Sequence, residues 1–154
     1  PHLLRDDPVY GPRAERLVAA TFDLAQWLPR EFAAASERAG GLVRQPGASP
    51  VVFHPPCTLQ HGQQVRGEVE QLLASLGVTV QPVADAHLCC GSAGTYSVLQ
   101  PALSQQLRER KLSDLQAGGP AMVLSANIGC IAHLQNGTDT PVRHWIEWLD
   151  EAIA

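Results

Sequence analysis

The residues of this sequence best suited to chemistry are its four cysteines. Cys89 and Cys90 are neighbours, whereas Cys57 and Cys130 lie far from them along the chain. The sequence shows no secretory signal, and adjacent cysteines could close only a strained ring, so we do not expect a disulfide framework. Four thiolates around one point are soft ligands that select an iron–sulfur cluster or zinc over magnesium or calcium. The cysteines therefore predict a metal centre.

Glycines stand beside the cysteines and predict tight turns around that centre. Gly91 and Gly94 follow the adjacent pair, and Gly129 precedes Cys130. Glycine tolerates a positive φ and lets the backbone approach an inserted group closely. Backbone N–H groups in such turns can also donate hydrogen bonds to sulfur and tune a reduction potential.

Histidine is the other residue type near the cysteines that can bind a metal. Within seven residues of a cysteine lie His54, His61, His87 and His133. A histidine in a turn more commonly donates a hydrogen bond to a backbone carbonyl, so this structural role is the alternative to metal binding for each of the four. His87, two residues before Cys89, is the first candidate for a substitute ligand or a residue that supports the ligands. His54 is the second.

The elements that must position these residues alternate between strands and helices. Apolar segments predict strands over 51–54, 78–83 and 120–126, and a strand followed by a helix over 141–153. Helical periodicity covers 65–76 and 98–115, where Pro101 either starts the main helix or kinks it. This alternation predicts an α/β domain with a mostly parallel sheet and flanking helices. Ligands bind at the carboxyl ends of such strands, so all four sulfurs are expected at one edge.

The residues before the first predicted strand differ in character from the rest. Helical patterns cover residues 12–28 and 30–38, and a glycine- and proline-rich stretch follows. The predicted organisation is an N-terminal helical segment over 1–39, a linker over 40–50 and the cysteine-rich α/β domain over 51–154.

Composition excludes several classes of protein. The chain is 45% hydrophobic and 17% charged, with a formal net charge of −4. Lys111 is the only lysine and no basic cluster occurs, which argues against nucleic-acid binding. The sequence contains no run of about 18 apolar residues, the length that would predict a membrane span. The expected location is cytoplasmic, with membrane association only through partners.

The cysteine motifs resemble a known family. Between Cys57 and Cys89 lie 31 residues, between Cys90 and Asn127 lie 36, and Asn127 stands three positions before Cys130. This resembles the CCG cysteine-rich domain of heterodisulfide reductases, lactate-utilisation proteins and the iron–sulfur subunits of glycolate oxidases. The local sequences at 54–57, 88–96 and 125–130 are most similar to the glycolate oxidase subunits, and the likeness extends to the opening residues 2–8.

The resemblance implies an iron–sulfur domain that relays electrons from a flavin-containing subunit towards quinone in a complex that oxidises glycolate. It implies Cys57, Cys89, Cys90 and Cys130 as ligands, [4Fe–4S] as the expected cluster, and no catalysis of glycolate oxidation by this chain alone. Subunits of this kind also carry a ferredoxin-like N-terminal part, which this sequence lacks.

The sequence departs from the family pattern at Asn127, where the family has a cysteine. Asn127 is therefore a possible weak ligand or a hydrogen-bond donor to cluster sulfide, and the disulfide-reducing chemistry of some relatives does not carry over. Three alternatives stay open: a zinc-stabilised or thiol-redox domain, a cluster-free docking module, and four isolated buried cysteines.

Overall fold

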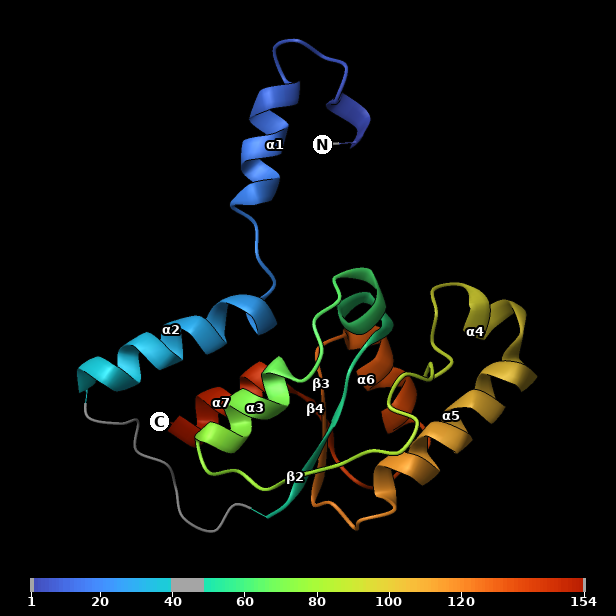
Figure 1. The fold of residues 1–154 in the computed structure, drawn as a ribbon. Helices are drawn as coiled ribbons and strands as arrows, with labels where there is room; N and C mark the ends of the chain where they lie inside the picture. The colour runs from blue at the N-terminus through green and yellow to red at the C-terminus, as the bar shows by residue number, and fades with distance from the viewer. Residues whose placement is uncertain (1, 40–48, 154) are drawn as a thin grey trace.

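A four-stranded, all-parallel sheet forms the centre of the molecule. The structure is a computed structural model that describes residues 2–39 and 49–153, so the predicted linker lies mostly outside the described residues. In order of their position in the sheet, the strands are β2 (Val80–Gln81), β1 (Val51–His54), β3 (Met122–Ser125) and β4 (Val142–His144). Each neighbouring pair is parallel (Figure 1). The predicted α/β fold class is confirmed.

The central strand β1 is buried along its whole length, as expected for a parallel strand covered on both faces. Its predicted bounds, 51–54, match the observed ones. It pairs with β3 from Val51↔Met122 to His54↔Ser125. The strand predicted over 78–83 is shorter, because only Val80 and Gln81 pair with β1.

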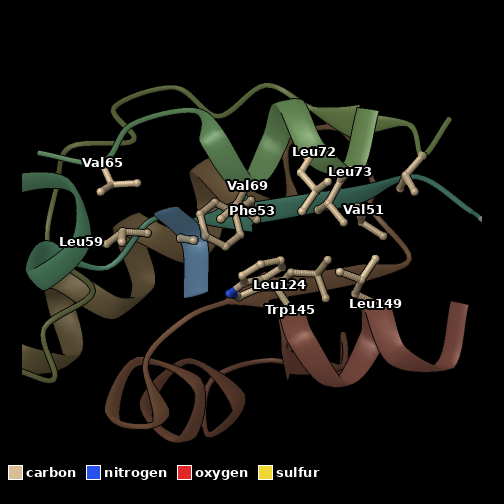
Figure 2. Close-up of a cluster of buried hydrophobic side chains, with 12 residues drawn as sticks. Val51, Phe53, Leu59, Val65, Val69, Leu72, Leu73, Leu124, Trp145 and Leu149 are labelled. Carbon is tan, nitrogen blue, oxygen red and sulfur yellow. The ribbon is translucent and has the colours of Figure 1, made fainter. Parts of the chain in front are cut away.

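One face of the sheet is covered by α2 (Leu24–Ala39), α3 (Glu68–Ser75) and α7 (Trp145–Ile153) (Figure 1). Side chains from α3 and α7 converge on Val51, Phe53 and Leu124 in the larger hydrophobic cluster (Figure 2). Because side chains alternate along a strand, Val52 and His54 point to the opposite face.

The opposite face is covered by α5 (Pro101–Gln116) and α6 (Ile128–Gln135) (Figure 1). Its smaller cluster joins Val52 and Val123 of the sheet to Leu112 and Leu115 of α5, and it contains the side chains of Cys90 and Cys130. Pro101 is the first residue of α5, directly after the short α4 (Tyr96–Leu99), so it starts the helix and does not kink it.

The N-terminal helices differ from the prediction in their bounds. After a 3₁₀ turn at His2–Leu4, α1 (Gly11–Ala19) ends well before residue 28, and α2 continues through Pro29. The break is fixed by a capping box, in which Asp23 Oδ1 accepts the Ala25 N–H at 2.9 Å and Gln26 Oε1 accepts the Asp23 N–H at 3.2 Å. Proline removes one hydrogen bond from α2, and the helix around it is held by packing of Ala25, Leu28 and Phe32 in the larger hydrophobic cluster.

Helix α1 projects away from the sheet and its helices (Figure 1). Helix α2, by contrast, packs on α3 and contributes to the larger cluster. No helix in the described ranges is long and apolar enough to cross a membrane.

Candidate metal centre

Three turns carry the four cysteines, and each follows one of three adjacent strands. Cys57 follows β1 and the pair Pro55-Pro56, at the start of a π-helical turn (Thr58–Gly62). Cys89 and Cys90 lie in the loop after β2, and Cys130 lies in the first turn of α6, after β3. Since β2, β1 and β3 are neighbours and parallel, their carboxyl ends lie at one edge of the sheet.

The four cysteines line one cavity at this edge, with a volume of about 170 Å³. Cys90 and Cys130 are buried, Cys57 and Cys89 are partly buried, and all four thiols are free. The other lining residues come from the same three turns: Pro56, Thr58, Ser92, Ala93, Gly94 and Asn127. Sequence separation therefore does not keep the sulfurs apart.

The two buried thiols lie close together, with their sulfurs within 4.8 Å of each other. The neighbouring side chain of Cys130 lowers the pKa of Cys90 to about 3 despite its burial, and the N–H of Ser92 adds to the effect. The neighbouring side chain of Cys90, together with burial, raises the pKa of Cys130. A thiophilic cation between the two sulfurs would stabilise both as thiolates.

The partly buried Cys57 is affected by its neighbour. Burial, followed by the neighbouring charge and hydrogen bond of Cys89, raises the pKa of Cys57 to about 11. This environment disfavours negative charge on Cys57 unless a positive centre is present. The donor set fits a thiolate-bound metal centre.

Gly91 shapes the turn after the cysteine pair. Its φ is +93°, and a Cβ at this position would lie 2.4 Å from the carbonyl oxygen of Ser104. The Gly91 N–H donates to Cys89 Sγ at 3.3 Å, while the buried Ser104 Oγ donates to the Gly91 carbonyl at 2.8 Å. Gly94 also has a positive φ, +53°, but a Cβ there would meet nothing within 4 Å.

Sequence reasoning missed Ser104, which lies in the middle of α5 and connects that helix to the cysteine turn. Its hydroxyl also lies 3.2 Å from His133 Nε2. The one signal in the sequence is a polar residue on the buried stripe of a helix, and it does not say which backbone group the side chain meets.

Lys111 and Gln60 fasten the loop that precedes Cys89. The Lys111 side chain is 1% exposed, and its ammonium donates to the Asp85 carbonyl at 2.8 Å. Gln60 Nε2 donates to the carbonyls of Pro55 at 2.9 Å and Ala86 at 3.2 Å, which joins this loop to the turn of Cys57. Burial lowers the pKa of Lys111, and nearby carboxylates oppose that shift.

Asn127 caps helix α6. Its Oδ1 accepts the N–H groups of Gly129 at 2.9 Å and Cys130 at 3.2 Å. A Cβ on Gly129 would lie 3.1 Å from that oxygen, so glycine leaves room for the cap. Asn127 lines the cavity, but its carbonyl oxygen is already occupied in positioning the backbone of Cys130.

The structure brings His54 to the buried cysteines and leaves His87 away from them. His87 is exposed and lines a separate cleft of about 350 Å³ next to the Cys57 turn. Its carbonyl lies 3.1 Å from His61 Nε2. His54 is 1% exposed, and one of its ring nitrogens lies within 4.8 Å of the sulfurs of Cys90 and Cys130.

Comparison with known proteins agrees with this geometry. The sequence pattern that defines the CCG family, described as a cysteine-rich domain, matches residues 51–135. The chain belongs to the CCG cysteine-rich domain family. The matched range contains all four cysteines and runs from the start of β1 to the end of α6.

Two relatives of this CCG protein indicate the kinds of longer protein that carry such a chain. It is 43% identical over 151 residues to the glycolate oxidase iron–sulfur subunit of Escherichia coli, which covers 98% of this chain and 35% of that protein. It is 30% identical over 162 residues to lactate utilization protein A of an Exiguobacterium species, covering 99% of this chain and 62% of that one. The chain thus spans between about a third and three fifths of these relatives.

The two glycines that follow the cysteine pair provide a matched test of the turn. We expect Gly91→Ala to destabilise the CCG domain by roughly 1–3 kcal/mol from the left-handed backbone alone. The contact with Ser104 adds to that loss. Gly94→Ala keeps a positive φ but meets no atom, so its loss is expected to be smaller. Urea denaturation of both variants measures the difference, and equal losses would show that the contact with α5 does not constrain the turn.

The cap on α6 can be tested separately. Asn127→Ala is expected to lower the free energy of unfolding by about 1 kcal/mol, because two N–H groups lose their acceptor. Asn127→Asp retains an acceptor oxygen at the same position and is expected to stay near the wild-type value. Denaturation curves of the two variants measure the difference in the free energy of unfolding. An Asn127→Ala variant as stable as the wild type would contradict the capping role.

Proposed function

We propose that this domain holds an iron–sulfur cluster through Cys57, Cys89, Cys90 and Cys130 and transfers electrons within a glycolate-oxidising complex. The observation that carries the proposal is the meeting of four free thiols, from the ends of three adjacent strands, around one cavity. Membership of the CCG family and the name of the Escherichia coli relative support the same reading.

The size of the cavity favours a cluster over a single zinc ion. Zinc in a structural site is enclosed by its four ligands and needs no further space. A volume of about 170 Å³ corresponds to several water molecules, since one water occupies about 30 Å³ of liquid. That space is large enough for a cofactor of several atoms, and we propose a [4Fe–4S] cluster.

When bound, such a cluster supplies one-electron redox chemistry. The chain's own residues hold it and set its surroundings. The N–H of Gly91 is directed at the sulfur of Cys89, and Cys90 and Cys130 are buried, so hydrogen bonding and a low dielectric both act on the site. Ser104, Lys111 and Gln60 act on the backbone of the turns and keep the thiols in place before anything binds.

The name of the Escherichia coli relative supports a place for this domain in a multi-subunit complex. We propose that electrons reach this domain from a flavin-containing subunit that oxidises glycolate, and that they pass onward towards quinone. Oxidation of glycolate itself is assigned to that partner.

Anaerobic reconstitution with iron and sulfide tests the ligand set. The wild-type chain is expected to gain iron, acid-labile sulfide and broad visible absorbance from sulfur-to-iron charge transfer. Each single cysteine-to-serine variant removes one thiolate and is expected to lose most of the iron. Thr58→Ala is the matched control, because Thr58 lines the same cavity without a thiol.

Three results would contradict the proposal: zinc bound in place of iron and sulfide, iron retained fully in every cysteine variant, or equal loss in Thr58→Ala. Circular dichroism of each variant separates the loss of a ligand from the loss of the fold.

A further inference from the structure

His54 is a buried imidazole that lacks hydrogen-bond partners. It is the last residue of β1 and is 1% exposed, and both ring nitrogens are fully buried with no partner among the described residues. An unsatisfied buried polar group costs about 1–3 kcal/mol, so native proteins rarely keep one without a role. A ring with two such atoms therefore indicates a missing partner.

The strand determines what this ring faces. Val51 and Phe53 point into the larger cluster, whereas Val52 and His54 point to the face of Cys90 and Cys130. On that face, one nitrogen of His54 and the two sulfurs all lie within 4.8 Å of one another. The missing partner is thus expected between the imidazole and the two buried thiols.

These separations suit a single metal ion. Bonds of about 2.1 Å to nitrogen and about 2.3 Å to sulfur put ligand atoms on one tetrahedral ion roughly 3.6–3.8 Å apart. The three ligand atoms, all within 4.8 Å of one another, are compatible with these spacings. Nitrogen and thiolate ligands on one ion are a common combination for zinc, and histidine replaces cysteine as an iron ligand in some clusters.

The other histidines of the chain, all within the described residues, have different surroundings. His2, His61 and His87 are exposed, His133 lies against Ser104, and His144 accepts the N–H of Ile146. His54 alone combines full burial, two free nitrogens and two neighbouring thiols.

We propose that His54 is a metal ligand, and that in the cluster-free protein it binds one ion together with Cys90 and Cys130. For an iron–sulfur cluster the inference rests on the proposed function, and His54 then binds an iron of that cluster. The centre then has mixed nitrogen and sulfur ligation. A neutral imidazole in place of an anionic thiolate raises the reduction potential of a cluster.

The direct test uses protein labelled with ¹⁵N-histidine and reconstituted anaerobically with iron and sulfide. In the paramagnetic redox state, pulsed EPR is expected to detect strong hyperfine coupling to one imidazole nitrogen. The coupling should vanish in His54→Ala and persist in the matched control His87→Ala, whose ring is exposed near the same turns. His54→Cys is expected to keep iron, lose the nitrogen coupling and lower the reduction potential.

A second arm uses Co²⁺ alone on the cluster-free, reduced protein. His54→Ala and His54→Asn are both expected to weaken Co²⁺ binding by at least about 10-fold, the smallest loss usually seen on removing even an outer partner of a metal ligand. His87→Ala should bind like wild type. His54→Asn retains a polar side chain, so the comparison does not depend on His54→Ala folding.

The outcomes separate this inference from the proposed function. If iron and sulfide bind but no nitrogen coupling is seen, or if the coupling survives in His54→Ala, His54 is not a ligand. The proposal of a cluster would then still hold. Absence of iron and sulfide would overturn the cluster, while the Co²⁺ titration still decides on His54. Equal Co²⁺ affinity in wild type and both His54 variants would refute the ligand there as well.

Discussion

Parallel pairing of β2, β1 and β3 is the constraint on which the cysteine cavity depends. The register of β1 and β3 aligns His54 with Ser125, and Ser125 Oγ donates to the His54 carbonyl at 3.0 Å. Both strands therefore end at the same level, and the turns that begin beyond them start side by side. A shift of one residue in β1 would move His54 to the opposite face and Cys57 away from the shared edge, because side chains alternate.

Buried polar side chains hold the turns and loops that follow the strands. Ser104, Lys111 and Gln60 each donate to a backbone carbonyl in a cysteine-bearing turn or in a loop leading to one, and each is almost fully buried. None of them lines the cavity. They fix backbone positions that four thiols alone could not maintain against their mutual repulsion once deprotonated. The cost of burying these groups is offset because each one finds a backbone carbonyl as acceptor.

The strands, the fold class and the meeting of the cysteines could be predicted because they depend on local patterns and on a general rule of parallel sheets. The passage of α2 through Pro29 could not, because it depends on packing of the helix in the larger hydrophobic cluster, which local patterns do not reveal. The helix predicted over 12–28 is divided in two because Asp23 caps the start of α2, a signal that helical periodicity alone does not register. The ranking of the histidines used distance along the chain, which favours His87. The alternation of side chains along β1 puts Val52 and His54 on one face, and it is the better predictor of which histidine lies near the buried cysteines.

Asn127 changes the charge of the site as well as its ligand count. In the family pattern that position is a cysteine, and a fifth thiolate would add negative charge to a cavity already lined by four thiols. Here an amide takes its place and holds the N–H groups of Gly129 and Cys130. One fewer anion lowers the desolvation penalty of the buried centre. Lys111 brings positive charge near the same loop without touching the sulfurs. The imidazole that we propose as a ligand at His54 would add a donor atom to this site without adding an anion.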